Sequence, residues 1–582
     1  MSQDASHGGD RKGEQGDGGD QPPLAPLRWR VRTLDPATAV RRGGLPAPQQ
    51  TAYIADRILV QGVPADDKAA VGSVIAELER AAAEHNWAVR LEAGDLADAR
   101  LLRRAGLDAE ALATAEPAFG FGLRVEPAPG RPAGPPDAWD LLEEVGEGLT
   151  AVAGEGIVLS LDHVLVAAPY TDPHPYTDPH PYTDPHPYTD PHPYTDPHPY
   201  TDPHPAPGLA EYGRAGSGGR SPVTWVGPAP RRRHKDGRTV DRTADGIERP
   251  VVAVLDTGTG RHPWLTDDVV VRDPQVLGEP IGTYPRPTNP LQDCEDGGMA
   301  IAPLTGGLDP VAGHGTFISG LVHQLCPDAV VLACRLYGGE GFIAEWDLLR
   351  SLRRLLVFHL RGLAGHADCY PVDVLSLSIG YRHERPQDAA FDTPFRHLLD
   401  TLRRTGVAVV VSAGNDGDPR PLYPAAFAPR LDRAVTPPTP IPPSTLSKDD
   451  PPVLTVGALN PDGTTALFSN DGPWVTCRRA GASLVSTFPV TLAGSRTPST
   501  SLVGTDPGER RGTVDPDDFS GGFGVWSGTS FAAPVLAGEI AAVLLRERER
   551  IGPRGVAGAT VHSRCEETWT AITETTGLEP TS

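Results

Sequence analysis

Four polar side chains follow or precede apolar runs, and together they could carry out nucleophilic catalysis. Asp256 comes directly after the run VVAVL, and Asn415 ends the run VVVSAGN. His314 lies in Gly-His-Gly-Thr, and Ser530 lies in Gly-Thr-Ser-Phe-Ala-Ala-Pro, each ahead of an apolar segment. A serine hydroxyl is a weak nucleophile, so it needs an imidazole to take its proton and a carboxylate to orient that imidazole. These residue types are the parts of an acyl-transfer site.

The surroundings of Ser530 and Asn415 suit that chemistry. Ser530 stands where the apolar run VLAGEIAAVLL predicts a helix to begin, so backbone N–H groups and the positive end of the helix dipole lie beside its hydroxyl. Pro534 fits the first turn of that helix. The amide of Asn415 can donate a hydrogen bond to a developing oxyanion. Glycines beside these residues allow a substrate to approach closely.

Five near-continuous apolar runs predict the sheet that must position these residues. The runs are VVAVLDTG, AVVLACRLY, VDVLSLSIG, VAVVVSAGN and VLTVGAL. Runs of this kind are typical of parallel strands buried on both faces. Helical segments lie between them, as at 345–362 and 390–405, so the pattern predicts an α/β domain with a doubly wound, mostly parallel sheet over 248–550. Functional residues of such a domain gather at the carboxyl ends of its strands.

The segment from about 249 to 548 resembles the subtilisin-like serine proteases, or subtilases. The aspartate motif of that family is similar to AVLDTGTGRHPWL, its histidine motif to GHGTFISGL, its oxyanion motif to SAGNDG and its serine motif to GTSFAAPVLAG. The resemblance implies a catalytic triad of Asp256, His314 and Ser530, with Asn415 at the oxyanion. Three long insertions between the motifs are expected to be surface loops, at about 267–310, 428–450 and 489–523.

The same resemblance implies the substrate and its binding residues. SLSIG (376–380) resembles the family strand that pairs with a substrate backbone, which implies binding roles for Ser376, Ser378, Gly380 and, beside the oxyanion residue, Gly414. The expected activity is that of a serine endopeptidase, which cleaves a protein or peptide through an acyl-enzyme. No cofactor is expected. Subtilases often bind Ca²⁺, but no aspartate-rich loop assigns a metal site in this sequence.

Residues 51–168 predict a separate small α+β domain. The order of its elements is strand, helix, strand, strand, helix, strand, with an extra helical stretch near 96–115, which is the βαββαβ order of a split βαβ unit. Subtilase propeptides also resemble such a unit, and they inhibit by placing their C-terminal tail in the cleft. Two interpretations stay open, an inhibitory propeptide that docks on the cleft and an adaptor that recruits or holds a dormant protease.

The remaining segments predict little regular structure. Residues 1–50 are polar and rich in Gly and Pro, so they are expected to be disordered. A linker is predicted over 169–247, beginning with six copies of Pro-Tyr-Thr-Asp-Pro-His in a polyproline II conformation. The histidines of these repeats suggest weak metal or partner binding, but a spacer is the favoured interpretation. Residues 551–582 are expected to form a C-terminal tail.

Composition excludes other classes of function. The chain has 52 Lys and Arg against 75 Asp and Glu, a net charge of −23, which disfavours nucleic-acid binding. No apolar run reaches the ~18 residues that span a bilayer, and the first residues lack the apolar core of a signal peptide. Together with few cysteines and no CxxC pair, this predicts a cytoplasmic protein without a membrane partner. An inactive subtilase-like scaffold is an alternative that the four complete motifs argue against.

Overall fold

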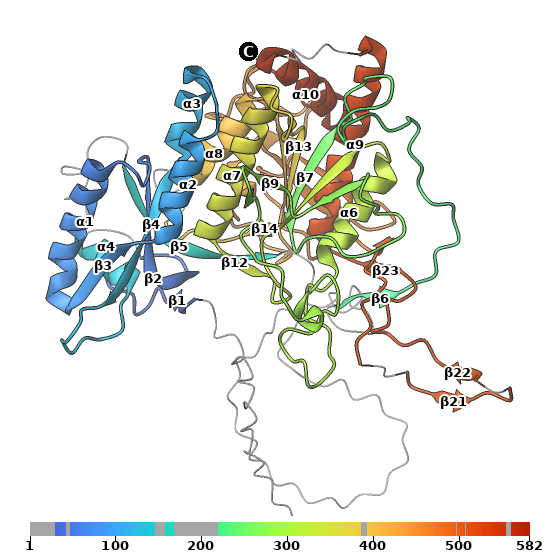
Figure 1. The fold of residues 1–582 in the computed structure, drawn as a ribbon, viewed down its shortest axis with the longest axis horizontal. Helices are drawn as coiled ribbons and strands as arrows, with labels where there is room; N and C mark the ends of the chain where they lie inside the picture. Colours follow the sequence, from blue (N-terminus) through green and yellow to red (C-terminus); the bar gives the residue numbers. More distant parts are fainter. Residues whose placement is uncertain are drawn as a thin grey trace, which may run out of the picture.

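The computed structural model describes residues 29–41, 47–145, 157–167, 219–385, 393–495, 498–506, 508–553 and 560–581. Two large sheets, one in each half of the chain, organise these residues (Figure 1). Helix α7 (Glu345–Leu363) packs between them, because one apolar cluster joins its leucines to strands of both sheets. The two halves therefore share part of their core.

Seven parallel strands form the sheet of the C-terminal half, in the order β19-β18-β15-β13-β7-β11-β8. Their bounds are Val251–Asp256 (β7), Val270–Arg272 (β8), Val330–Arg335 (β11), Val374–Leu377 (β13), Ala408–Ser412 (β15), Leu454–Leu459 (β18) and Cys477–Ala480 (β19). Successive side chains of β7 enter two different apolar clusters, with Val251 on one face and Val252 on the other. The prediction of a doubly wound parallel sheet is confirmed.

Helices cover both faces of this sheet. On one face lie α7 and α8 (Thr393–Arg404), and on the other lie α6 (His314–Leu325) and α9 (Thr529–Ile551). Among the described helices, α9 is long and apolar enough to cross a bilayer, but 83% of its apolar window is buried inside the protein. Packing against the sheet accounts for its composition.

Two segments expected to be irregular are packed on this domain instead. The predicted tail over 551–582 contains α10 (Val561–Thr576), whose Trp569 enters the same apolar cluster as α9. The C-terminal part of the predicted linker also packs on the domain, because β6 (Ser221–Pro222) pairs with β23 (Phe523–Trp526). The linker part buries isolated side chains such as Arg220, which leave no periodic pattern in the sequence. Helix α10 buries Cys565, Trp569 and Ile572 at helical spacing, a signal that the prediction of a tail overlooked. The repeats at 169–204 lie outside the described residues.

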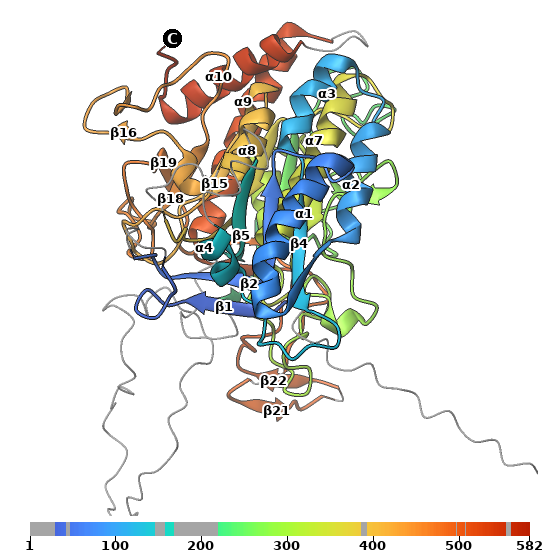
Figure 2. The same cartoon turned by 90° about the vertical axis from the view of Figure 1, so that its left-hand side faces the viewer.

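An antiparallel sheet forms the N-terminal half, in the order β12-β5-β2-β4-β3, with β1 beside β2. Its own strands are Val31–Leu34 (β1), Thr51–Gln61 (β2), Trp87–Leu91 (β3), Gly120–Pro127 (β4) and Val158–Ala167 (β5). Its helices are Lys68–Ala82 (α1), Ala93–Arg103 (α2), Ala109–Ala115 (α3) and Ala138–Val145 (α4). Helices α1 and α4 cover one face, and α2 lies beside α7 (Figures 1 and 2).

Strand β5, the last strand of the N-terminal half, pairs with two strands that belong to the C-terminal half. Strand β5 lies antiparallel to β12 (Phe342–Ala344) and to β14 (Ile379–Gly380). Gly380 is opposite Val166 in this register, and the Ala167 N–H donates to the carbonyl oxygen of Gly341 at 2.7 Å. The end of β5 therefore lies between two segments of the parallel-sheet domain.

The insertions contain three short two-stranded elements within the described residues. Their strands are Gln275–Val276 (β9) with Glu279–Pro280 (β10), Leu431–Asp432 (β16) with Thr439–Pro440 (β17), and Ser501–Val503 (β21) with Arg510–Gly512 (β22). Leu484–Thr487 (β20) precedes the last insertion and belongs to a three-stranded sheet with β23 and β6. The hairpin of β21 and β22 is exposed and projects from the body of the protein (Figure 1). Strand β20 pairs with β23 and so supports the segment that leads into α9.

Candidate active site

The structure gathers the four predicted residues at the carboxyl edge of the parallel sheet. Asp256 is the last residue of β7, and Asn415 follows β15. His314 begins α6, and Ser530 lies in the first turn of α9. Helices α6 and α9 pack side by side on the same face of the sheet, so the residues at their starts meet at one edge.

Asp256 and His314 form a buried hydrogen-bonded pair. His314 Nδ1 is 2.7 Å from Asp256 Oδ1, and their side chains are 0% and 1% exposed, respectively. The Thr257 N–H donates to the same carboxylate oxygen at 2.8 Å, and the Tyr337 hydroxyl donates to Oδ2 at 2.6 Å. With these donors the carboxylate is held in one orientation, and it keeps the proton of the neutral imidazole on Nδ1. Nε2 is then the basic nitrogen.

His314 and Ser530 lie on the neighbouring helices α6 and α9. Within the part of the chain that the structure describes, His314 Nε2 and Ser530 Oγ are both buried without a hydrogen-bond partner. The ring of Phe531, the residue after Ser530, lies 5.3 Å from the His314 ring between centroids. A hydrogen bond between Nε2 and Oγ is therefore not formed in this state. Such catalytic hydrogen bonds often form only when substrate is bound.

Asn415 is held by the residue that precedes the serine. Its Oδ1 accepts hydrogen bonds from the Thr529 N–H at 2.8 Å and from the Thr529 hydroxyl at 2.9 Å. The opposite end of the amide is the NH₂ group, which is the end that can donate to an oxyanion. Gly414 has φ +100°, and a Cβ there would lie 2.3 Å from Asn470 Nδ2. Only glycine therefore gives the backbone that presents Asn415.

The predicted substrate-binding residues fall into two groups. Ser378 donates to the carbonyl oxygen of Ser530 at 3.1 Å, and Gly380 pairs with β5. Ser376 differs, because it lies inside β13 between β7 and β15 and its side chain is 2% exposed. Its backbone is committed to the sheet, so a substrate strand has no access to it. The sequence assigned Ser376 to the cleft because SLSIG was treated as a single extended segment.

Sequence reasoning missed Tyr337, which holds Asp256. Tyr337 is the last residue of the strand-like run AVVLACRLY, so the rule that pointed to Asp256 at the end of its run also applied to this residue. Burial and the neighbouring Asp256 carboxylate raise the pKa of the Tyr337 hydroxyl well above its usual value. The hydroxyl therefore stays protonated and remains a donor to Asp256.

Glu295 is a second residue that the sequence did not indicate. It belongs to the insertion at 267–310, which was expected to be a surface loop, but it is 2% exposed and lies behind the Asp256–His314 pair. Its carboxyl group accepts hydrogen bonds from the hydroxyls of Thr257 and Thr316 and from the Gly315 N–H. Burial raises the pKa of Glu295 to about 7 in spite of these donors. No periodicity or motif marks the residue.

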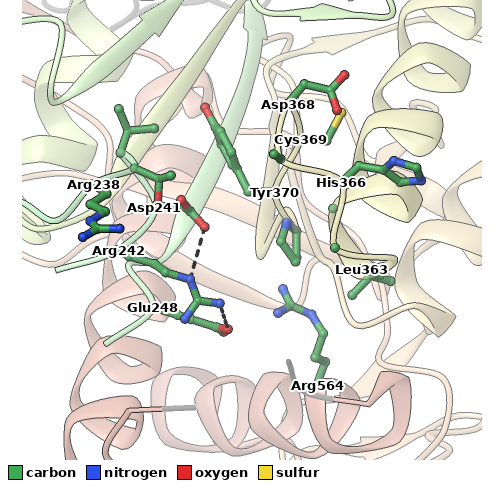
Figure 3. Close-up of a pocket in the computed structure, with 16 residues that line it drawn as sticks. Arg238, Asp241, Arg242, Glu248, Leu363, His366, Asp368, Cys369, Tyr370 and Arg564 are labelled. Atoms are coloured by element: carbon green, nitrogen blue, oxygen red, sulfur yellow. Dashed lines mark hydrogen bonds and ion pairs between the residues drawn. The ribbon is translucent and has the colours of Figure 1, made fainter. Parts of the chain in front are cut away.

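A separate cavity lies at the opposite edge of the sheet. It has a volume of about 520 Å³ and is lined by residues before β7, by the turn between α7 and β13, and by Arg564 of α10 (Figure 3). Arg242 donates to Glu248 at 2.8 Å on its wall. Because its lining residues precede the strands, the cavity faces away from the carboxyl edge and has no part in the arrangement around Ser530.

A buried carboxylate–imidazole pair beside a serine at a helix start, on the carboxyl edge of a parallel sheet, is the arrangement of a serine protease on an α/β fold. The model of the subtilase family matches residues 248–577 of the chain. This match covers more than half of the protein. The chain belongs to the subtilase family.

Two curated relatives are similar to parts of the chain. Mycosin-4 of Mycobacterium tuberculosis is 25% identical over 306 residues, which cover 51% of this chain and 55% of mycosin-4. Proprotein convertase subtilisin/kexin type 9 of Mus musculus is 30% identical over 192 residues, which cover 33% of this chain and 24% of that protein. The chain thus spans about half and about a quarter of these relatives.

Solved structures are also similar, at low identity and low TM-score. Fervidolysin from Fervidobacterium pennivorans matches with a TM-score of 0.40 and 15% identity, over 88% of this chain and 57% of fervidolysin. A lanthipeptide protease matches with a TM-score of 0.33 and 17% identity, over 55% of this chain and 78% of that protease. Likenesses at this level carry no argument about substrate.

Proposed function

We propose that the chain is a serine endopeptidase that works through an acyl-enzyme. His314 Nε2 takes the proton of the Ser530 hydroxyl as its Oγ attacks a peptide carbonyl, and later delivers that proton to the leaving amine. Asp256 orients the imidazole and stabilises its protonated form. Water then hydrolyses the acyl-enzyme. The observation that carries this proposal is the buried 2.7 Å contact of His314 with Asp256 beside the start of α9.

The oxyanion is assigned to two donors in this proposal. The NH₂ group of Asn415 is one, because Thr529 fixes the other end of the amide. The Ser530 N–H is the second, since it belongs to the first turn of α9, where backbone N–H groups have no partner within the helix. Donors that are already fixed before the reaction stabilise the developing charge without reorganisation.

The N-terminal domain is proposed to restrain this activity. The position of β5 antiparallel to β14 supports an inhibitory role, because β14 belongs to the segment where a substrate strand is expected to pair. Pairing with β12 on its other side adds to the same argument. An adaptor would have no need to occupy that edge. The substrate proposed for the free cleft is accordingly an extended segment of a protein or peptide.

Labelling by a fluorophosphonate together with peptide cleavage tests the proposed activity. Both are measured in the wild type, in Ser530→Ala and in a matched control, Ser520→Ala, which removes an exposed hydroxyl elsewhere. We expect both signals to vanish only in Ser530→Ala. If docking of β5 masks the site, the same three proteins are compared with Ala167→Pro added to weaken that docking. Equal labelling of Ser530→Ala and the control in that background contradicts the proposal.

A further inference from the structure

Four ionisable side chains meet where β5 joins the protease domain, and we name them the interface cluster. They are His163 of β5, Glu345 at the start of α7, and His383 and Glu384 in the segment after β14. Each is at most 4% exposed. His163 Nδ1 is 2.7 Å from Glu345 Oε2, and His163 Nε2 is 2.7 Å from Glu384 Oε2. The N-terminal domain supplies one residue, and the protease domain supplies three.

The composition of the interface cluster is unusual for a buried site. Burying charge is costly unless the groups are paired or bind a metal ion. Two carboxylates and two neutral imidazoles carry a charge of about −2, and a divalent cation brings this sum to zero. Two imidazoles and two carboxylates buried together are a donor set that a divalent transition-metal ion can bind and neutralise.

The geometry of the cluster also matches a metal site. One ligand atom from each of His163, His383 and Glu384 lies within 4.8 Å of the others. Glu345 holds the remaining ring nitrogen of His163, and a carboxylate on the second nitrogen is the usual partner of a metal-bound histidine. A tetrahedral ion with bonds of ~2.1 Å separates its ligand atoms by roughly 3.4 Å. The Glu384 carboxylate would have to move by less than about 1 Å from its present hydrogen bond to His163.

We propose that the interface cluster binds one divalent transition-metal ion of the Zn²⁺ class, with His163, His383 and Glu384 as ligands. Two imidazoles and a carboxylate are ligands that such ions prefer, whereas Ca²⁺ and Mg²⁺ take oxygen ligands. The ligands come from both domains, so the ion fastens β5 to the protease domain. It binds only the docked state, and at 100 times its Kd it shifts the docking equilibrium about 100-fold.

Binding is tested in the full chain with Co²⁺, which reports its coordination by visible absorption. The protein carries Ser530→Ala to prevent self-cleavage, and the six repeat histidines, at 174, 180, 186, 192, 198 and 204, are changed to Gln to remove competing ligands. After chelator treatment we expect one equivalent of Co²⁺ with the strong bands of a four-coordinate ion. Stoichiometric Zn²⁺ should displace it.

Variants assign the ion to the interface cluster. His163→Gln and His383→Gln should each abolish the Co²⁺ bands, and Glu345→Gln should weaken binding about 10–100-fold by releasing the His163 ring. His85→Gln is the matched control, because His85 pairs with Glu144 on the surface of the same domain. Circular dichroism checks that each variant folds. If His163→Gln does not fold, His383→Gln and Glu345→Gln decide the assignment.

The effect on activity rests on the proposed function, so it is measured separately. Zn²⁺ should lower peptidase activity of the otherwise wild-type chain, and His383→Gln should remove that effect while the His85→Gln control keeps it. Absence of Co²⁺ bands, or bands that persist in His163→Gln and His383→Gln, overturns the metal site. If the Co²⁺ bands appear as expected but Zn²⁺ does not change the peptidase activity, the metal site stands and only its role in fastening β5 is overturned. A chain without any peptidase activity contradicts the proposed function and not the site.

Discussion

The two sheets of this protein are completed in different ways. The parallel sheet takes all seven of its strands from residues 251–480, and its edges require nothing from the N-terminal half. The antiparallel sheet takes its strands from both halves, because β12 and β14 flank the end of β5. A sheet that is complete within one contiguous segment is a permanent scaffold. A sheet that borrows strands across a domain boundary is stable only while the domains stay together.

Side-chain contacts differ in the same way between the surroundings of Asp256 and the boundary between the two domains. Around Asp256 the donors come from within the protease domain, namely Thr257, Tyr337 and His314. Along the domain boundary, ion pairs cross between the halves in addition to the shared apolar cluster, as where Arg354 of α7 donates to Asp98 of α2 at 2.8 Å. The proposed catalytic groups thus depend on one domain, whereas the proposed restraint depends on contacts between two.

The largest expected effect on activity comes from a substitution in the parallel sheet, at Asp256. Asp256→Asn keeps the shape of the side chain but removes the charge that orients His314, so kcat should fall by about 10⁴-fold, the size associated with this change in a serine-protease triad. Steady-state kinetics measure the loss. Asp267→Asn is the control, because Asp267 also follows β7 in the chain but its side chain is exposed. A fall below tenfold would mean that Asp256 does not act on His314.

Weakening the pairing of β5 with the protease domain should raise peptidase activity instead of lowering it. Ala167→Pro removes the N–H that donates to Gly341, and the lost hydrogen bond should release β5 enough to raise peptidase activity about tenfold. Ala167→Ser keeps the N–H and should leave activity unchanged. Initial rates on a short peptide give the comparison. Unchanged rates in Ala167→Pro would argue that β5 does not limit access to the cleft.

A third substitution, at Tyr337, tests whether this residue positions Asp256 or only stabilises the fold. Tyr337→Phe removes the donor to Asp256 Oδ2, which costs about 1–3 kcal/mol for a buried acceptor, so kcat should fall about tenfold. Steady-state kinetics measure kcat, and urea unfolding measures the accompanying loss of stability. Tyr370→Phe, in the cavity at the opposite edge, is the control. A kcat within twofold of the wild-type value would mean that Tyr337 contributes packing but does not position Asp256.

The smallest effect on activity is expected from Glu295→Gln. Because the folded pKa of Glu295 is about 7, above its unfolded value, the folded state keeps the proton longer, and this group lowers stability as pH rises from about 4.5 to 7. Removing the ionisation should cancel that slope, which is on the order of 2 kcal/mol across the interval. Urea unfolding at pH 5 and pH 7.5 measures it, while kcat stays within about threefold. An unchanged pH dependence would show that Glu295 does not titrate there.

The sequence predicted the parallel sheet well because its strands are buried on both faces and read as apolar runs. The same property indicated Asp256 and Asn415, which end such runs, and the four motifs led to the family. Glu295 could not be predicted, because it sits in an irregular insertion and acquires its role from tertiary packing. The pairing of β5 with β14 could not be predicted either, since contacts between strands some 200 positions apart leave no local pattern.

The anchoring of residues 219–249 on the protease domain decides what a cut in the chain would do. Arg220 is fully buried, and its guanidinium donates to the carbonyl oxygens of Asp309 and Pro310. A nick anywhere from 168 to 218 would therefore leave the new end held on the protease body and would release only the N-terminal domain, the proposed inhibitor, from its covalent link. The high effective concentration of β5 would disappear, and dilution by itself would then favour the open cleft.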